Sequence, residues 1–393
     1  MKILIVGGGI GGLTAALCLA KSGHEVAIYE KATANHNVGA GIQCGANAVH
    51  VLDHLGLLDF LEPLAVTPER LQFRDYLNGD LLYNVELGLV YRNKYGAPYF
   101  HLHRADLMAV LEGQVSNEPN VNLITGTAVA RYHENKSSVT LELESGETVD
   151  GDILVGCDGI RSAIREQMLG TQTYEYTGNL AWRATLPVQS LPDEFMNTVA
   201  TNFVGPKKHM VMYYLRDRQL LNMVGVVEGQ EFRGSSWVSK GDWGQLKRDF
   251  SGWHPMVETV VNAVDKNECY QWALFDHKPL ANWSSKRVTL LGDAAHATLP
   301  FIASGAAMAI EDARILDRSI EVEQSVESAI QRYQKNRIPR TSKIQNTSRK
   351  FGKLYHIQNR FFLKAAFAGL RTMGGKKENF LPEYDANSIT LKN

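Results

Sequence analysis

The chain has 393 residues, enough for two or three domains at roughly 150 residues each. Hydrophobic residues make up 44% of it and charged residues 21%, which excludes a mostly disordered chain, a collagen-like repeat and a disulfide-rich miniprotein. The 41 Lys and Arg nearly balance the 42 Asp and Glu, so the overall charge favours neither nucleic acid nor an anionic membrane as a partner. Four widely spaced cysteines form no CxxC pair and no Cys/His cluster. This predicts no metal site, no redox dithiol and a reducing, cytoplasmic compartment.

The N-terminal segment is uncharged between Lys2 and Lys21, so it could be mistaken for a signal peptide or a membrane span. Five glycines within six positions interrupt it and favour a strand, a turn and a helix instead. Residues 3–6 form the apolar run of a strand buried in a parallel sheet, and residues 13–21 have helical spacing. A second strand is expected over residues 24–30, which completes a βαβ unit.

The glycines match the pattern G-x-G-x-x-G between the first strand and the helix. Gly7 permits the tight turn, Gly9 lets the backbone approach a pyrophosphate, and Gly12 allows the helix to pack closely on the strand. Glu30 lies eighteen residues beyond Gly12, at the end of the second strand, where a carboxylate would accept ribose hydroxyls. Together these features predict a dinucleotide site rather than a merely tight turn.

Two further buried strands are expected, at residues 153–155 and 288–291, and each leads into a glycine and an aspartate. The first precedes Asp158-Gly159 and the second precedes Gly292-Asp293. Between them, residues from about 178 to 228 alternate apolar and polar side chains, which is typical of an antiparallel sheet. The sequence therefore predicts an α/β domain interrupted by a β-rich one.

These three motifs, in this order and spacing, resemble those of the single-component (group A) FAD-dependent aromatic hydroxylases. Within that family the chain is most similar to the salicylate hydroxylase-like and 6-hydroxynicotinate 3-monooxygenase-like enzymes, from Lys2 to about Arg349. The resemblance implies an α/β fold with a Rossmann-like FAD-binding domain of the glutathione reductase type. This discontinuous domain would comprise residues 1–72, 101–176 and 272–335. A β-sheet substrate domain would comprise residues 73–100 and 177–271, and a C-terminal helical region residues 336–393.

The same resemblance implies which residues hold FAD. Arg104 would contact the pyrophosphate, Asp293 would accept ribityl hydroxyls, and Asp158 would serve both FAD and the nicotinamide cofactor. The alternative from composition alone is that Asp158 simply caps a helix. The helix that starts at Gly305 would stabilise negative charge on reduced flavin. The full implied set is Gly7, Gly9, Gly12, Glu30, Lys31, Gly41, Ile42, Arg104, Asp158, Asp293, Pro300, Gly305 and Ala306.

The resemblance also implies the reaction. The chain would be an NAD(P)H- and O₂-dependent monooxygenase that hydroxylates a small phenolic or pyridinol carboxylic acid through a C4a-hydroperoxyflavin. The substrate would be similar to salicylate, hydroxybenzoate or hydroxynicotinate. Because no second glycine fingerprint is present, NADH or NADPH would bind only transiently. Two alternatives stay open: a quinone-precursor hydroxylase acting near a membrane, and a flavin-binding redox sensor that hydroxylates nothing. The protein is expected to be a monomer or a homodimer.

His209 and Tyr213 are the expected catalytic residues. They are four positions apart, so on a strand both face the same side. In the resembling branch a His and a Tyr at this spacing line the aromatic pocket, and a histidine suits the role of base for a phenol. The alternative is that His209 is an ordinary histidine of the strand. Arg183 and Arg216 could pair with a substrate carboxylate, although strand arginines more often lie on the surface.

Two features depart from the average pattern. Ser304 stands where many relatives carry a glutamine that can reach the substrate, which could enlarge the pocket.

Residues 331–377 contain thirteen Lys and Arg and no Asp or Glu, whereas everything before them carries a net charge of −12. A helical pattern in this basic segment is broken at Pro339, and we expect a structural helix pair there rather than a membrane anchor.

Overall fold

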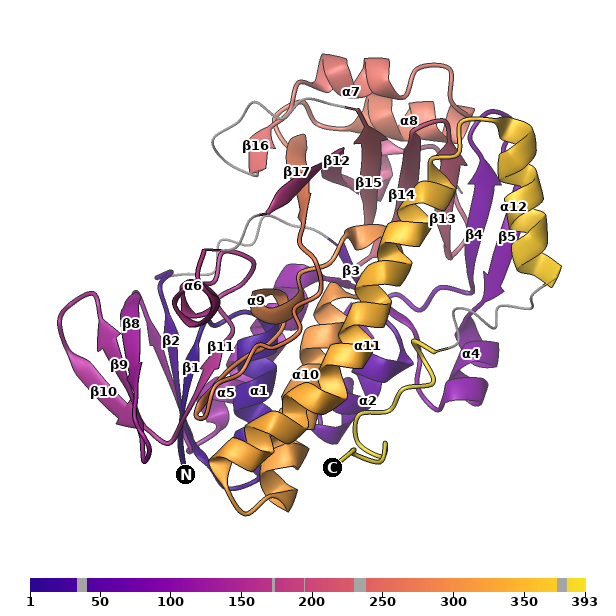
Figure 1. Ribbon diagram of the computed structural model, residues 1–393. Coiled ribbons are helices and arrows are strands. Elements are labelled where there is room, and N and C mark those ends of the chain that lie inside the picture. The colour runs from indigo at the N-terminus through magenta and orange to yellow at the C-terminus, as the bar shows by residue number, and fades with distance from the viewer. Residues whose placement is uncertain (34–40, 172–173, 194, 230–237, 373–379) are drawn as a thin grey trace.

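The computed structural model describes residues 1–33, 41–171, 174–193, 195–229, 238–372 and 380–393 (Figure 1). It consists of a lower part built on a parallel sheet and an upper part built on a larger, mostly antiparallel sheet, as Figure 1 shows. The long helix α11 (Val326–Tyr355) runs from the lower part to the upper one.

The parallel sheet has the strand order β18-β11-β1-β2-β7. The strands are β1 (Lys2–Val6), β2 (Glu25–Glu30), β7 (Val121–Thr125), β11 (Ile153–Gly156) and β18 (Val288–Leu290). All pairings are parallel, which brings the carboxyl ends of β1, β11 and β18 to one edge. The three predicted motifs follow these strands, so the topology gathers them at that edge.

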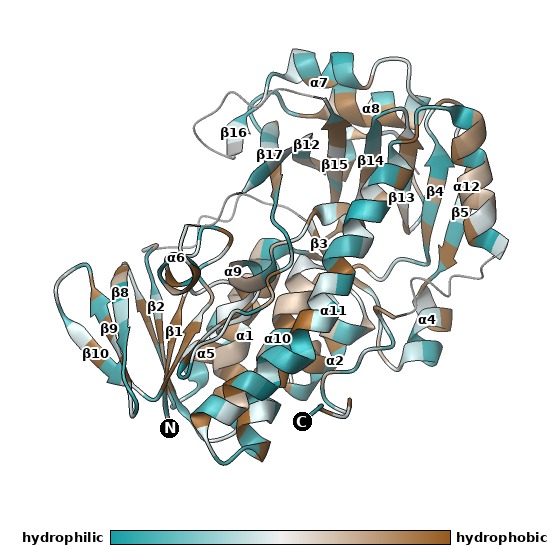
Figure 2. Ribbon diagram, viewed as in Figure 1, coloured by the Kyte–Doolittle hydropathy of each residue, from teal (hydrophilic) through white to brown (hydrophobic). Residues whose placement is uncertain are grey.

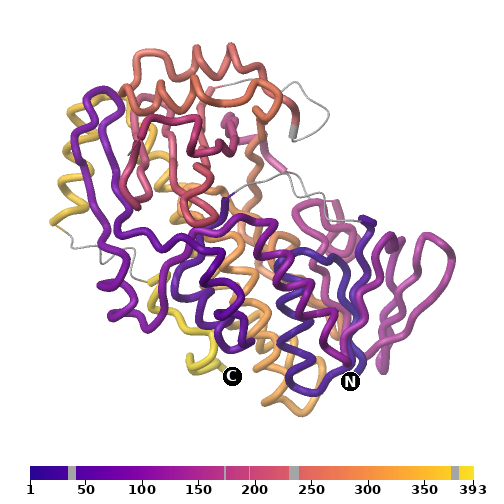
Figure 3. The backbone as a smooth tube through the Cα atoms, turned by 180° about the vertical axis from the view of Figure 1, so that it is seen from behind, coloured from indigo at the N-terminus to yellow at the C-terminus, as the bar shows by residue number. Residues whose placement is uncertain are grey.

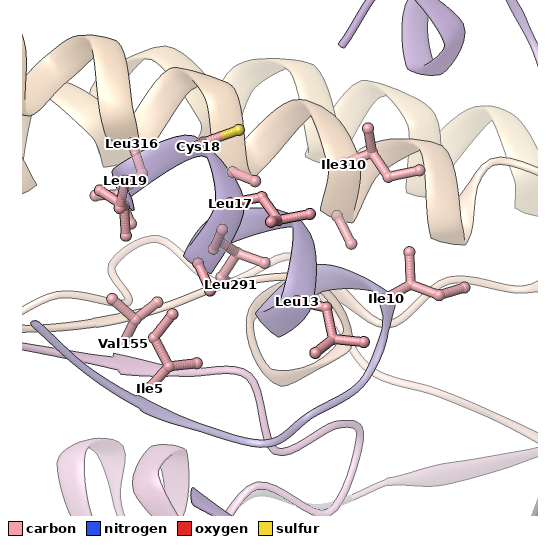
Figure 4. Packing of buried hydrophobic residues seen from close by; sticks show 14 of the residues in the cluster. Ile5, Ile10, Leu13, Leu17, Cys18, Leu19, Val155, Leu291, Ile310 and Leu316 are labelled. Carbon is pink, nitrogen blue, oxygen red and sulfur yellow. The ribbon is translucent and has the colours of Figure 1, made fainter. Parts of the chain in front are cut away.

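Helix α1 (Ile10–Lys21) forms the centre of the lower core (Figure 4). Its Leu13 and Leu17 belong to one buried cluster with Ile5 of β1 and with Ile310 of α10 (Gly305–Val322), the helix that packs against α1. The helix is apolar on nearly every side because a strand lies against one face and helices against the other. This packing buries the uncharged N-terminal segment, as the βαβ interpretation requires.

The upper sheet has eight strands in the order β16-β17-β12-β15-β14-β13-β4-β5. They are β4 (Arg70–Asp75), β5 (Leu81–Glu86), β12 (Glu175–Pro187), β13 (Val199–Gly205), β14 (Lys208–Leu215), β15 (Leu220–Glu228), β16 (Val238–Lys240) and β17 (Tyr270–Asp276). Only β13 and β4 pair in parallel. Helices α7 (Trp243–Asp249) and α8 (Pro255–Ala263) cover one face, where Met210, Met212 and Trp182 are buried. The other face is turned toward the lower part.

Helix α11 corrects one expectation, because it continues through Pro339 without ending there. Pro339 is exposed, so the carbonyl that loses its hydrogen bond can be solvated by water. The helix contacts α10 below and meets α12 (Arg360–Thr372) above. Viewed from both sides, α12 lies along the β4–β5 hairpin (Figures 1 and 3).

Smaller elements complete the fold. They are β3 (Gly41–Cys44), α2 (Ala46–His54), α3 (Leu58–Leu61), η1 (Glu62–Leu64), α4 (Gly88–Tyr95), β6 (Phe100–His103), α5 (Arg104–Asn117), β8 (Val129–Glu134), β9 (Val139–Leu143), β10 (Thr148–Gly151), α6 (Ala163–Leu169), η2 (Val188–Ser190), α9 (Asp293–His296) and η3 (Pro300–Ile302). The β8–β10 sheet lies at the outer edge, where Figure 2 shows hydrophilic and hydrophobic residues mixed along the strands. The expected domain boundaries stay a proposal, although the upper sheet draws its strands from residues 70–86 and 175–276.

Within the described ranges, no helix combines the length and apolar character needed to cross a bilayer.

Candidate active site

The three fingerprint glycines have different surroundings in the turn between β1 and α1. Gly7 has φ +107°, and an added Cβ would lie 2.3 Å from the carbonyl oxygen of Cys157. At Gly12 a Cβ would lie 2.0 Å from the carbonyl oxygen of Gly7, so only glycine lets the helix approach the turn. At Gly9 a Cβ would meet nothing within 4 Å. The open space therefore lies at the start of α1, where a pyrophosphate would meet free N–H groups.

Glu30 ends β2 beside this turn. Its carboxylate accepts hydrogen bonds from the backbone N–H of Gly8 at 2.7 Å and from that of Ala32 at 2.8 Å. These bonds hold the side chain next to the glycine turn, in reach of a ribose bound there. Lys31, the next residue, is exposed.

Arg104 and Asp293 lie near each other at the edge of the parallel sheet. Arg104 begins α5 and is half-buried, and desolvation lowers its pKa while Asp293 raises it. Asp293 begins α9 after β18; it is exposed, yet the protein atoms around it raise its pKa by desolvation. His296 and Arg104 partly offset that shift. The two predicted ligand groups thus share one electrostatic environment.

Asp158 is both a helix-capping group and a candidate ligand. Its Oδ2 accepts a hydrogen bond from the backbone N–H of Ile164 at 3.2 Å, at the start of α6. Its Oδ1 is buried and has no hydrogen-bond partner among the described residues. A buried carboxylate oxygen without a partner is costly, so this atom fits a hydroxyl or amide donor of a bound dinucleotide.

Arg165 joins the two aspartate motifs. Its guanidinium donates to the carbonyl oxygen of Ala294 at 2.6 Å and also to that of Ile160. Sequence reasoning gave this arginine no role, because the carbonyl of Ala294 that it reaches lies 129 residues away in the chain. It fixes the spacing between Asp158 and Asp293.

The segment before α10 has the unusual conformation expected of a cofactor-facing turn. Pro300 opens η3, and Ala303 has φ +50°, which is rare for a residue with a side chain. Ser304 is buried, and its hydroxyl donates to the carbonyl oxygen of Ile302 at 2.9 Å. Gly305 and Ala306 remain partly exposed at the start of the helix, where backbone N–H groups have no partner within the helix.

Gly41, one of the residues that the resemblance implies for FAD binding, contacts the upper sheet. Its N–H donates to Oδ1 of Asn222 at 2.9 Å, and an added Cβ would lie 2.6 Å from the hydroxyl of Tyr213. Ile42 pairs with Leu102 in the β3–β6 ribbon. Residues 39 and 40 of the same loop lie outside the described residues.

The upper sheet presents a row of side chains toward the lower part. Arg183 pairs with Val224, Val224 with Val211, and Val211 with Asn202. Val211 and Val224 stay partly exposed although they lie on central strands. They form an apolar floor on which a planar ring could lie.

His209 and Tyr213 flank this floor on β14, two residues to either side of Val211. Both are buried, and at about 3.3 Å per residue their Cα atoms are roughly 13 Å apart. Tyr213 packs against His101 with ring centroids 4.4 Å apart, and burial raises its pKa well above the usual range. The structure therefore places the pair on one face, at opposite ends of the floor.

The two arginine candidates are separated by the structure. Arg216 forms a bidentate ion pair with Asp106 of α5, at 2.7 and 2.9 Å. Arg183 stacks on Trp272 at 4.4 Å, and its buried Nε has no hydrogen-bond partner among the described residues. Desolvation lowers the pKa of Arg183, while Tyr213 raises it. Of the two arginines, Arg183 therefore lies in the row with Val224 and Val211 and has an N–H donor without a partner among the described residues.

His209 has a partner that sequence reasoning missed. Its Nδ1 lies 2.8 Å from Nε2 of His356, which caps the C-terminus of α11. The second imidazole is 147 residues away and belongs to the basic segment. No local pattern signals this contact.

The remaining histidines of the region have structural roles. His103 caps α5 by accepting from the N–H of Ala105 at 3.2 Å. His296 is buried, and its Nε2 lies 2.5 Å from Oδ2 of Asp312. Both side chains therefore hold the local structure of the segments that carry them.

The comparisons with known proteins cover most of the chain. The profile of a family described as "FAD binding domain" matches residues 1–348. A 3-hydroxybenzoate 6-hydroxylase of Polaromonas naphthalenivorans is 34% identical, over 91% of this chain and 89% of its own. A 6-hydroxynicotinate 3-monooxygenase of Bordetella bronchiseptica is 33% identical, over 88% and 90%. A substrate complex of salicylate hydroxylase superposes with a TM-score of 0.83 and 26% identity, over 98% and 96%.

These matches confirm the predicted resemblance, the predicted fold class and FAD as the cofactor, because they span nearly the whole chain. The chain therefore belongs to the family of FAD-dependent aromatic hydroxylases, and it is a flavoprotein monooxygenase.

Proposed function

We propose that this enzyme hydroxylates a small aromatic carboxylic acid that already carries a ring hydroxyl, with NADH or NADPH as the reductant. The observation that carries the proposal is the arrangement of Arg183 at one end of the apolar floor of Val211 and Val224. An unpaired, desolvated guanidinium favours a carboxylate, and two valines favour a ring. The named relatives, which act on hydroxybenzoate and hydroxynicotinate, fit the same substrate class.

We assign roles to the FAD-site residues from the resemblance and from the positions of these residues in the fold. Gly9 and Arg104 would bind the pyrophosphate of FAD, Glu30 the adenosine ribose, and Asp293 the ribityl chain. The start of α10 would hold the flavin ring with its N–H groups. Bound FAD supplies hydride acceptance from the reductant and the activation of O₂.

His209 and Tyr213 would act on the substrate. Electrophilic oxygen transfer proceeds faster on a phenolate than on a phenol, so a base near the ring hydroxyl accelerates it. Burial and the nearby His356 hold the pKa of His209 well below its usual range, so its imidazole is neutral and one ring nitrogen carries a lone pair. Tyr213 would orient the ring at the opposite end of the floor. Because the reductant is an intracellular metabolite, we place the enzyme in the cytoplasm.

The test is NADH and NADPH oxidation with 3-hydroxybenzoate, 6-hydroxynicotinate and salicylate, with products identified by mass. We expect at least one of these acids to stimulate oxidation and to gain one oxygen atom. Benzoate, which lacks the hydroxyl, and phenol, which lacks the carboxylate, are the matched controls and should give little product. Bound FAD without product from any of the three acids would contradict the proposal and favour a redox sensor.

Variants of the sheet residues test the assignment. Arg183→Gln should raise KM for the acid by roughly 10- to 100-fold, the effect of one lost charge-assisted hydrogen bond. Arg216→Gln, whose guanidinium is paired with Asp106, is the control and should leave KM near the wild-type value. His209→Ala and Tyr213→Phe should slow hydroxylation more than flavin reduction and divert turnover to hydrogen peroxide. An unchanged product yield per NAD(P)H in both would exclude this role for the pair.

A further inference from the structure

Three side chains form a chain of contacts from the sheet interior to the surface. His209 Nδ1 lies 2.8 Å from His356 Nε2, and His356 Nδ1 lies 3.3 Å from Oε2 of Glu228. His209 and His356 are buried, whereas the side chain of Glu228 is 46% exposed. The three residues come from β14, the end of α11 and the end of β15. Figure 1 shows α11 reaching the upper sheet at these strands.

The hydrogen-bond partners determine the tautomers of both rings. A carboxylate oxygen accepts hydrogen bonds, so the contact with Oε2 of Glu228 places a proton on Nδ1 of His356. Burial lowers the pKa of His356, although Glu228 raises it in part, so the ring is neutral and Nε2 is an acceptor. His209 must then donate from Nδ1, which leaves its Nε2 with a free lone pair. The chain of contacts thus prepares His209 to accept a proton at Nε2.

We propose that Glu228, His356 and His209 form a proton relay that carries the ring-hydroxyl proton of the substrate to solvent. The inference rests on the proposed function, since it needs a substrate with an acidic hydroxyl. The proton leaves the substrate oxygen for Nε2 of His209, and the Nδ1 proton of His209 moves to Nε2 of His356. The Nδ1 proton of His356 then passes to Glu228 and on to water. One proton is taken up and one released, and the substrate is left as its anion.

The surroundings of the relay suit this transfer. His356 is the C-terminal cap of the 30-residue helix α11, where the helix dipole stabilises a transient imidazolium. The rings of Phe301 and Tyr355 lie 5.5 and 5.3 Å from His209, so bulk water does not compete at the inner end. Among the described residues, His209 and Glu228 are the titratable groups in contact with the imidazole of His356. His209 is a catalytic residue in this scheme, and His356 and Glu228 act through it.

The test compares His356→Gln with the wild-type holoenzyme. Glutamine can hydrogen-bond to both neighbours but cannot accept a proton at one atom and release it from another. The control is His254→Gln, because His254 lies on the opposite face of the same sheet, stacked on Phe203. We expect unchanged FAD affinity and flavin reduction in both variants. In His356→Gln, hydroxylation should fall tenfold or more and hydrogen peroxide should rise.

A second readout does not depend on turnover. In the oxidised enzyme without NAD(P)H, ultraviolet difference spectra report whether bound 3-hydroxybenzoate is the phenol or the phenolate. We expect phenolate formation in the wild type and in His254→Gln, and a loss of it in His356→Gln and, more weakly, in Glu228→Gln. In His356→Gly, added imidazole should restore hydroxylation, whereas N-methylimidazole, which cannot accept and donate in turn, should not.

The outcomes separate the two proposals. If the wild type hydroxylates none of the three acids, the proposed function fails and the relay with it. If the wild type turns over and His356→Gln matches it in phenolate formation and in coupling, only the relay is wrong. Rescue of His356→Gly by N-methylimidazole as well as by imidazole would reduce His356 to a packing role.

Discussion

Gly9 and Gly12 are three residues apart, but an added methyl group would meet open space at one and the backbone at the other. We therefore expect Gly9→Ala to fold with a near-normal Tm for the apoprotein and to bind FAD at least tenfold more weakly, because its methyl occupies the space for the pyrophosphate. Gly12→Ala should instead lower the Tm of the apoprotein, since its Cβ would lie 2.0 Å from the carbonyl oxygen of Gly7. Thermal unfolding of the apoprotein and fluorescence titration with FAD measure the two effects separately. Equal losses of Tm in both variants would contradict this division.

His101 makes the stability of the enzyme depend on pH. Burial lowers the pKa of its imidazole to about 3, and its Nε2 has no hydrogen-bond partner among the described residues. Below the ordinary histidine pKa of about 6.5 the unfolded chain takes up a proton that the folded chain does not, so stability falls as the pH falls. The slope for one such group is at most about 1.4 kcal/mol per pH unit.

We expect the free energy of unfolding to decrease between pH 6.5 and pH 5, and to decrease less in His101→Phe. Phenylalanine keeps a ring against Tyr213 and cannot titrate. The matched control is His133→Phe, at an exposed strand position, which should keep the wild-type slope. Urea unfolding at several pH values gives the slopes, and identical slopes for wild type and His101→Phe would exclude the effect.

At single positions, the sequence could predict those site residues whose roles depend on neighbours close in the chain. The glycine spacing and Glu30 could be identified because a βαβ turn constrains neighbours in the chain. The role of Arg183 was harder to predict. Alternation along a strand shows which residues share a face, but it does not show which face other elements cover. His356 could not be predicted as the partner of His209, since a contact across 147 residues depends on where α11 ends.

At the scale of elements, α10 and α11 are joined by a buried ionic network. Arg337 is fully buried and pairs with Glu311 at 2.7 Å and with Asp312 at 2.5 Å. Arg340 also pairs with Glu311, and Asp312 accepts from the N–H of Gly292. The network therefore ties α11 to the turn that carries Asp293. It also explains how α11 passes Pro339, because the two arginines on either side of the proline are held by α10.

We expect Arg337→Gln to reduce the free energy of unfolding by about 3–5 kcal/mol, because it leaves buried carboxylates without their charge partner. Lys335→Gln, at an exposed position on the same helix, should change it by less than about 0.5 kcal/mol. Denaturant unfolding measures both. A loss below about 1 kcal/mol in Arg337→Gln would mean that the network contributes little to the joint between the helices.

At the scale of the whole molecule, ion pairs link the upper and lower parts around the site. Arg216 at the end of β14 reaches Asp106 of α5, and Arg349 of α11 reaches Asp276 of β17. Such partly exposed pairs contribute little to stability, about 0.2–1 kcal/mol each. Their effect is geometric, since they fix the floor of Val211 and Val224 relative to the FAD-binding turns.

The basic segment is the feature that would bring the whole molecule to a membrane, and its contacts argue against that role. Six of its cations pair with acidic side chains of the described residues: Arg332, Arg337, Arg340, Arg349, Arg360 and Lys364. Residues 373–379, at its end, lie outside the described residues. In α12 the packing against the upper sheet is made by Leu363 and Phe367, whereas Phe361 and Phe362 are exposed, at 76% and 62%.

We therefore expect little cosedimentation of the enzyme with phosphatidylserine-rich vesicles at physiological salt. Stable surface binding needs an amphipathic face that combines free cations with apolar side chains, and here six of the thirteen cations already pair with acidic side chains. A Phe361→Ser, Phe362→Ser double variant is the control: it should pellet as little as the wild type and keep the wild-type hydroxylation rate. Strong pelleting of the wild type that salt abolishes and the double variant lacks would contradict this prediction. That result would favour a quinone-precursor hydroxylase that works at a membrane surface, and it would identify the exposed pair of phenylalanines as the point of contact.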